Sequence, residues 1–368
     1  MKIQLLINQP ALALMLALIP ALTQAAARDN AGAVFTMDNA TTANHVLAYN
    51  RSADGALTPA GVFDTGGRGT GAGLGNQSAL VLSRDGQWLF ACNAGSDQLS
   101  VLSTRPNGLL LAQKINSEGR RPISLALHGN LLYVLNAGGQ AGDKDQVTGF
   151  MFFNGQLFHL SDSARPLSAD NTGPAQVSFS SDGRVLVVTE KNTRVIDTFT
   201  VDTGGLIDQH QQFQSIGTTP FGFGVHGDNL FVSEASLATV SSYDLHDDGN
   251  LEVVSPSVPT TQAATCWVVV TRDGHFAYAS NTGTGVVSGY SVAPDASISL
   301  LNPTGVSGNI GAGSKPIDMA LTANSRFLYI LNSGNNTLSA FRVNQDGSLD
   351  SLRGVSGIPS GANGLAAR

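Results

Sequence analysis

The chain has 368 residues, of which 42% are hydrophobic, so it is long enough to bury a large core. Its formal net charge of −7 and its lack of long Lys/Arg runs give no support for binding to nucleic acid or to an anionic membrane. The 42 glycines, beside a charged fraction of only 13%, favour an all-β fold with many tight turns.

Residues 1–27 have the pattern of a secretory signal peptide. Lys2 supplies the positive start, residues 11–22 are apolar, and the alanines at 25–27 offer a cleavage site. Pro20 interrupts the apolar run, which is too short to span a bilayer, although a retained membrane anchor is the alternative. We therefore expect a periplasmic or secreted protein, free of the membrane after cleavage, with a single domain over residues 28–368.

The first strands of this domain are predicted at residues 33–38 and 46–50. They have the character of a second and a third strand, with no first strand ahead of them. Residues 66–75, GGRGTGAGLG, follow as the longest flexible stretch. They predict either a mobile flap over a ligand site, with Arg68 as an anion contact, or a slack linker.

From residue 77 onward one pattern recurs: a first strand, a tight turn, an apolar second strand ending in Asn or Glu, and a third strand. A repeat of about 40 to 50 residues with four strands is the signature of a β-propeller. The copies cover residues 77–103, 122–139, 173–206, 220–245, 265–292 and 316–343. Their second strands end at Asn93, Asn136, Glu190, Glu234, Asn281 and Asn332.

The C-terminal residues 359–368 resemble a first strand with no second strand after it. The simplest arrangement pairs this strand with the incomplete N-terminal unit, which closes a ring and leaves no free sheet edge. Six internal units and one shared unit make seven. The sequence therefore predicts an all-β, seven-bladed propeller of four-stranded blades, which we expect to be monomeric.

Cysteine and glycine patterns give no sign of a disulfide or a cofactor. Cys92 and Cys266 fall in blades on opposite sides of the predicted ring, too far apart to pair, so we expect two buried thiols. Residues 222–227 match the Gly-x-Gly-x-x-Gly dinucleotide pattern but enter a hairpin turn instead of a helix. No His-x-His pair is present, and we predict no cofactor and no metal ligands.

Catalytic candidates come from the face that carries the second-to-third-strand loops, which surrounds the central funnel of a propeller. Glu190 and Glu234 occupy equivalent positions on adjacent blades, where the other copies carry Asn. Two neighbouring carboxylates can act as acid and base, or Glu190 can help to hold a Ca²⁺- or Mg²⁺-like ion. The alternative is structural, because polar residues at strand ends often bind the next loop through hydrogen bonds.

Further residues of this face are candidates for binding a small-molecule ligand. Four cations in the upper loops can bind an anionic group, and amide side chains can bind polar groups. Trp267 can stack on a ligand, although packing between blades is the more common use of such a ring. The full set of binding candidates is Arg121, Lys191, Arg194, Lys315, Asn136, Asn281, Asn332, Gln176 and Trp267.

The repeats SRDGQWLFACNAGS (83–96), SDGRVLVVTEKNT (181–193), TRDGHFAYASNTG (271–283) and SRFLYILNSG (325–334) resemble the seven-bladed β-propeller lactonase family. That family includes 6-phosphogluconolactonases and carboxymuconate-cycloisomerising enzymes. The resemblance implies an exported protein that hydrolyses or isomerises a small lactone in the funnel, with Glu190 as the family-like acidic residue. A non-catalytic scaffold that binds a small molecule, glycan or protein is the alternative, because residues 173–176 lack the histidines common in the family and Thr282 replaces its usual arginine.

Overall fold

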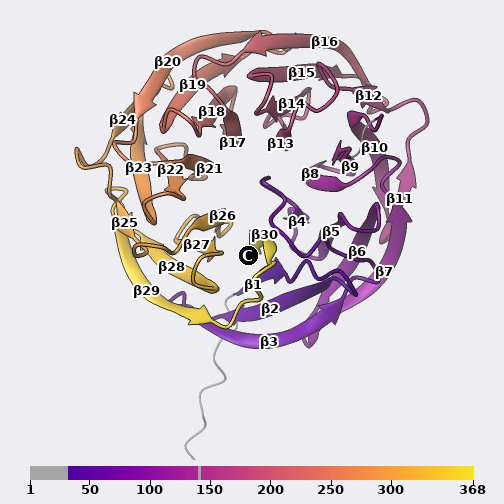
Figure 1. Ribbon diagram of the computed structural model, residues 1–368, viewed down its shortest axis with the longest axis horizontal. Coiled ribbons are helices and arrows are strands. Elements are labelled where there is room, and N and C mark those ends of the chain that lie inside the picture. The colour runs from indigo at the N-terminus through magenta and orange to yellow at the C-terminus, as the bar shows by residue number, and fades with distance from the viewer. Residues whose placement is uncertain (1–31, 140–141) are drawn as a thin grey trace, which may run out of the picture.

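The computed structural model describes residues 32–139 and 142–368, which form seven antiparallel sheets arranged around a central axis (Figure 1). The prediction of a seven-bladed β-propeller is confirmed. The predicted signal peptide lies outside the described residues, so its cleavage stays a prediction. In the described ranges no helix is long and apolar enough to cross a membrane.

Each blade is a sheet whose strands follow one another from the axis outward. Blade 1 contains β30 (Asn363–Ala367), β1 (Gly32–Met37), β2 (His45–Arg51) and β3 (Leu57–Asp64). Blade 2 contains β4 (Leu80–Leu82), β5 (Trp88–Asn93), β6 (Gln98–Arg105) and β7 (Gly108–Asn116). Blade 3 contains β8 (Pro122–His128), β9 (Leu131–Ala137), β10 (Asp145–Phe153) and β11 (Gln156–His159), with β12 (Arg165–Pro166) also on β10. Blade 4 contains β13 (Pro174–Phe179), β14 (Val185–Glu190), β15 (Val195–Val201) and β16 (Ile207–Gln214).

The remaining blades follow the same order. Blade 5 contains β17 (Pro220–His226), β18 (Asn229–Glu234), β19 (Thr239–Leu245) and β20 (Leu251–Pro259). Blade 6 contains β21 (Thr265–Val270), β22 (Phe276–Asn281), β23 (Val286–Val292) and β24 (Ile298–Leu300), with β25 (Gly308–Asn309) also on β23. Blade 7 contains β26 (Pro316–Leu321), β27 (Phe327–Asn332), β28 (Thr337–Val343) and β29 (Leu349–Ser356).

Ring closure occurs in blade 1, as the sequence predicts. The C-terminal strand β30 pairs antiparallel with β1, with Val34 opposite Ala367. The hydroxyl of Thr36 also donates to the carbonyl of Gly364 at 2.7 Å. Both partners of this closing pair are buried, which protects the edge that each strand would otherwise expose.

The hydrophobic core lies between the blades. All six residues of β14 are buried, because both faces of this strand pack against neighbouring blades. One cluster joins Leu135 of blade 3 to Phe179 of blade 4, and another joins Val187 of blade 4 to Phe223 of blade 5. Outer strands such as β16 expose most of their residues to solvent, so their sequence is mostly polar, whereas inner strands such as β14 are mostly apolar.

Candidate functional site

A plug of residues 74–78 lies across the central channel, the axial space that the innermost strands enclose. The segment leads from β3 to β4, and its trace runs into the centre of the ring (Figure 1). The plug contacts blades on several sides of the axis. Asn76 Nδ2 donates to Ile123 O, and Asn76 O accepts a hydrogen bond from Trp267 Nε1 at 2.7 Å. The next residue, Gln77, donates from its backbone N to Ala175 O at 3.1 Å and from its Nε2 to Val268 O at 2.8 Å. The plug therefore bridges blades 3, 4 and 6 across the channel.

The glycine-rich segment before the plug is also fixed. Gly69 N donates to Ala40 O and Gly71 N donates to Asn39 O, each at 2.7 Å. A Cβ atom at Gly69 would collide with the backbone of Asn39, which explains the need for glycine there. The predicted flap or slack linker is thus a strap bound to blade 1.

Gln176 belongs to a set of braces between the innermost strands. Its side chain accepts a hydrogen bond from Phe223 N at 2.7 Å and donates to Phe223 O at 3.0 Å, which joins blades 4 and 5. Blade 5 has Gly222 at the equivalent place, and Gln77 of the plug takes over the role by bonding Val268 N and O of blade 6. A Cβ at Gly222 would collide with Gln77 Oε1. Gln176 therefore holds the scaffold, and its predicted ligand role gains no support from these contacts.

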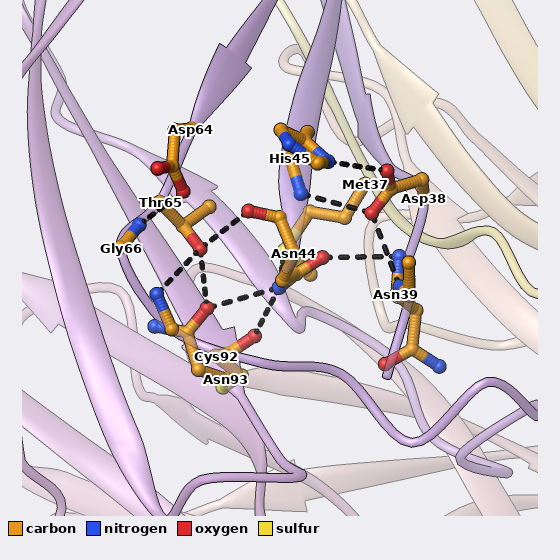
Figure 2. Close-up of polar contacts among 12 residues, drawn as sticks. Met37, Asp38, Asn39, Asn44, His45, Asp64, Thr65, Gly66, Cys92 and Asn93 are labelled. Atoms are coloured by element: carbon orange, nitrogen blue, oxygen red, sulfur yellow. Dashed lines mark hydrogen bonds and ion pairs between the residues drawn. The ribbon is translucent and has the colours of Figure 1, made fainter. Parts of the chain in front are cut away.

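The asparagines that end the second strands are likewise scaffold residues. Figure 2 shows Asn93 in blade 2, where its Oδ1 accepts hydrogen bonds from Thr65 Oγ1 at 2.7 Å and from Asn44 Nδ2 at 3.0 Å. Its Nδ2 donates to Ser100 Oγ at 2.7 Å. The three asparagines predicted as ligands are fully buried and make bonds of the same kind. Asn136 donates to Ser117 O at 3.2 Å, Asn281 to Ser288 Oγ at 2.9 Å and Asn332 to Ser339 Oγ at 2.9 Å.

Glu234 takes the same place in blade 5 and is also fully buried. Its carboxylate accepts four hydrogen bonds, all from blade 5 and the loop that leads into it. The donors are Gly217 N at 2.7 Å, Ser241 Oγ at 2.6 Å, Ser257 Oγ at 2.7 Å and the hydroxyl of Thr239. Four donors satisfy the lone pairs of a carboxylate, so these contacts do not support the predicted catalytic role.

Glu190, its counterpart in blade 4, has an acidic neighbour. Its carboxyl group accepts hydrogen bonds from Ser168 N at 2.9 Å and from the hydroxyls of Ser168 and Thr193, and Asp197 is the acid beside it. Burial, with the adjacent acid, raises the pKa of Glu190 to about 7, and burial raises the pKa of Asp197 to about 6. Asp197 in turn bonds His210 Nε2 at 2.6 Å. Glu190 and Asp197 thus form a pair of buried acids inside blade 4, and the structure does not bring Glu190 and Glu234 together.

The upper ends of the innermost strands define a rim around the plug. In five blades the residue just before the innermost strand has a positive φ: 54° at Arg121, 62° at Gly173, 62° at Thr219, 56° at Ala264 and 50° at Lys315. This conformation is unfavourable for residues other than glycine, and such strain is enriched at functional sites. Arg121 and Lys315 therefore have a backbone conformation that is unfavourable for their residue type, and their surroundings or their function must stabilise it.

Lys191 is the charged group in contact with the plug. Its Nζ donates to Gly75 O at 2.6 Å and to Pro174 O at 2.9 Å, and it lies 5.0 Å from the centroid of the Phe221 ring. That ring packs edge-on against Trp267 at 4.9 Å. Burial, together with the charge of Arg121, lowers the pKa of Lys191 to about 8. The upper end of the channel thus brings together three predicted binding residues, Arg121, Lys191 and Trp267.

Arg121 has a free guanidinium group within the described part of the chain, where it forms no ion pair. Its backbone N–H donates to Asp97 Oδ1 at 2.7 Å, and Arg120 pairs with the same carboxylate at 3.3 Å. The side chain lines a cavity of about 250 Å³ with Gly139 and six other residues. This cavity opens between blades 2 and 3, beside the rim.

The other predicted binding residues lie apart from this group. Arg194 and Lys315 are exposed, and their described hydrogen bonds run through their backbone carbonyls, to Ser215 N at 2.9 Å and to Ser333 N at 3.0 Å. Cys92 and Cys266 are free and buried, as expected, and burial raises the pKa of each thiol. Among the described residues no group of three His, Cys, Asp or Glu side chains is placed to hold a metal ion.

Two features escaped the sequence analysis. The plug residues Asn76 and Gln77 follow an irregular glycine-rich stretch, and no periodicity marks them. Asp197 does leave a signal: seven residues after the Asn or Glu that ends the second strand, four other blades carry Ser100, Ser241, Ser288 and Ser339. Blade 3, whose loop at this point is longer, has Asp143 there.

Comparison with known proteins was made for both sequence and structure. A family model described as "Lactonase, 7-bladed beta-propeller" matches residues 33–150, 144–269 and 239–367, which together cover nearly all of the described chain. No protein with a curated description matches the sequence.

Several solved structures share the fold. A periplasmic gluconolactonase of Pseudomonas aeruginosa is 16% identical with a TM-score of 0.69, covering 91% of this chain and 98% of that one. A proposed 6-phosphogluconolactonase of Bacteroides fragilis is also 16% identical, with a TM-score of 0.70 over 93% of this chain and 99% of that one. A protein of Lactobacillus plantarum gives a TM-score of 0.74 at 15% identity, over 92% and 99%.

Proposed function

Since the chain belongs to the seven-bladed β-propeller lactonase family, we propose that it hydrolyses a small lactone at the upper end of the plugged channel. The observation that carries this proposal is the position of Lys191, held against the plug by two carbonyl oxygens and beside Arg121. The two cations have different tasks in the reaction.

Lys191 is proposed as the general base. A neutral amine has two N–H bonds and one lone pair, and the carbonyls of Gly75 and Pro174 accept two N–H bonds. The lone pair then points away from both carbonyls. With its pKa lowered to about 8, a useful fraction of Lys191 is neutral in mildly alkaline solution and takes a proton from the attacking water.

Arg121 is proposed to stabilise the charge that develops on the lactone oxygen. A guanidinium is a fixed cation. Within the described residues that of Arg121 forms no ion pair, although Asp97 and Asp143 line the same cavity. A fixed cation beside the reacting carbonyl lowers the barrier to the tetrahedral intermediate. The same cation then attracts the carboxylate of the ring-opened product.

Export is part of the same proposal. The signal-like residues 1–27 support it, and a structural neighbour is a periplasmic gluconolactonase. An extracytoplasmic enzyme meets sugar lactones without a phosphate group. Aldonolactones are therefore the first substrates to test, before phosphorylated ones.

The test is a panel of lactones followed in a pH-stat, with spontaneous hydrolysis subtracted. Wild-type activity on D-glucono-1,5-lactone is expected to rise with pH through about 8, following the pKa of Lys191. Lys191→Arg keeps the charge but cannot act as a base, and should lower kcat by about 10²-fold or more. Arg121→Gln should also lower kcat, whereas Arg194→Gln, an exposed cation of the same face, serves as the control.

Glu190→Gln decides between the two candidate bases. If Glu190 is the base, as the family resemblance implies, this variant loses activity and Lys191→Arg retains most of it. The proposal expects the reverse. A non-catalytic binding scaffold is the second candidate, favoured by the burial and complete hydrogen bonding of Glu234. It predicts no hydrolysis of any lactone, with an aldonate raising the melting temperature of the wild type but not of Arg121→Gln.

A further inference from the structure

A second cavity lies at the closing seam, the contact between blades 1 and 2 beside the β1–β30 pair. Its volume is about 750 Å³, within the range of small-ligand sites. The start of β1 and the turn between β6 and β7 border it, so it opens on the lower face, opposite the plug. The side chains used in the argument below are Phe35, Ala48, Tyr49, Ala60, Arg105 and Arg368.

One part of this cavity is apolar and rigid. Phe35 and Tyr49 are 3% and 6% exposed, and each belongs to a hydrophobic core cluster, so the core fixes their rings. Ala48 and Ala60 extend this surface along β2 and β3 with small side chains that leave space open. A planar aromatic or short aliphatic group fits such a wall. Its binding removes apolar area from water and costs little conformational entropy, because the wall is already fixed.

The other part is positively charged. Arg368 Nη1 donates to Gly86 O at 2.7 Å and to Thr104 Oγ1 at 3.0 Å, and Arg105 Nε donates to Ser103 Oγ at 3.1 Å. All these acceptors are neutral, and within the described residues neither guanidinium forms an ion pair. None of the described residues that line the cavity is Asp or Glu, and the carboxylate of Arg368 is balanced by Arg51, whose Nε donates to it at 3.0 Å. Arg368 also lies 6.0 Å from the centroid of Phe35, which places its charge at the edge of the apolar wall.

We propose that this seam cavity binds a small organic anion with an apolar body, such as an aromatic or medium-chain carboxylate. The carboxylate pairs with Arg105 and Arg368, for which the planar fork of a guanidinium is well suited, and the body packs on Phe35 and Tyr49. Arg105 comes from blade 2, whereas Arg368 directly follows β30 of blade 1. The ligand therefore bridges the seam and stabilises ring closure. This site is independent of the lactonase proposal, which concerns the opposite face.

The experiment measures binding of 2-naphthoate to the full chain by isothermal titration calorimetry, with 2-naphthylmethanol as the uncharged analogue. Wild-type protein is expected to bind one naphthoate and to bind the alcohol at least about tenfold more weakly, since a charge-assisted pair contributes about 1.5–3 kcal/mol. Naphthoate should also raise the melting temperature.

Three variants locate the site. Arg105→Gln should weaken naphthoate binding by about tenfold, and Ala60→Trp should abolish it by filling the cavity from its partly exposed edge. Arg353→Gln, an exposed arginine of β29 outside the cavity, should bind like the wild type. Arg105→Gln should leave any lactonase activity unchanged. Equal affinity for acid and alcohol, unchanged binding in Ala60→Trp, or no saturable binding in folded wild-type protein would each overturn the proposal.

Discussion

Blades 4 and 5 place the same residue at the same point of the repeat and give it different surroundings. Glu234 accepts four hydrogen bonds, three of them from hydroxyls. Glu190 meets the carboxyl of Asp197 where blade 5 offers the hydroxyl of Ser241. A hydroxyl always brings its own proton to a carboxylate, whereas a second carboxyl must take one from the solvent. Blade 4 therefore has a pair of buried acids with raised pKa values at this point, where blade 5 has one carboxylate surrounded by donors.

The largest effect is expected when the donor set of blade 5 is broken. Glu234→Gln replaces an acceptor oxygen by an NH₂ group that faces hydroxyl and N–H donors at a fully buried site. We expect a loss of about 2–3 kcal/mol of unfolding free energy, the cost of unsatisfied buried groups. Urea denaturation at pH 8 measures it. A loss below about 1 kcal/mol would show that the hydroxyls simply rotate to suit the amide.

The next effect is a pH dependence of the unfolding free energy to which the two acids of blade 4 contribute. Both carboxyls have folded pKa values, about 7 for Glu190 and about 6 for Asp197, above those of the unfolded chain. The folded protein thus holds protons that the unfolded chain releases, and this stabilisation is complete below about pH 4 and lost as the pH rises to 7. Burial lowers the pKa of His210, which opposes the trend below about pH 6.5. The net expectation is a fall of about 2 kcal/mol between pH 5 and pH 8.

The control for this pH dependence is Asp197→Ser, which gives blade 4 the serine that blades 2, 5, 6 and 7 carry at this position. Its unfolding free energy should vary much less over the same range and should exceed that of the wild type at pH 8. Urea midpoints at pH 5, 6, 7 and 8 provide the comparison. The same slope in both proteins would place the titrating groups elsewhere.

A third difference between the two blades concerns their braces. Gln176 of blade 4 joins blades 4 and 5, whereas the bonds to Val268 of blade 6 come from Gln77 of the plug and not from a residue of blade 5. Gln176→Ala and Gln77→Ala should each cost about 1–2 kcal/mol, since each loses two hydrogen bonds to buried backbone groups. Only Gln77→Ala should also loosen residues 74–78, seen as faster amide hydrogen exchange there. Equal exchange in both variants would mean that Asn76 and Lys191 suffice to hold the plug.

The smallest effect is expected for Glu190→Gln at pH 8. At pH 8, above the pKa values of both acids, the neutral amide removes the repulsion between two carboxylates and can donate to Asp197. This gain offsets the weaker bonds from Ser168 and Thr193. We expect a change of less than about 1 kcal/mol. The same substitution thus has different costs in two neighbouring blades.

The repeat was predictable from sequence because each blade obeys the same pattern of strand, turn and strand-end polar residue. Closure by residues 363–367 was predictable for the same reason, since one strand was missing at one end and extra at the other. The candidate site was harder to predict. Asn281, Asn332 and Gln176 are polar and recur near the axis, but their side chains turn into the protein and bond the backbone or Ser hydroxyls. Whether a polar side chain faces a neighbour or a ligand depends on packing between blades that are distant in sequence.

The closing pair has a kinetic consequence. The bond between Thr36 and Gly364 joins residues 328 positions apart, so the ring closes only after almost the entire chain between them has become compact. Contacts of such high sequence separation slow folding, because loop entropy is lost before the contact compensates for it. The reverse also holds: opening one blade strains its neighbours while the ring stays closed. A protein built in this way should unfold slowly and survive proteases for longer than its equilibrium stability alone suggests.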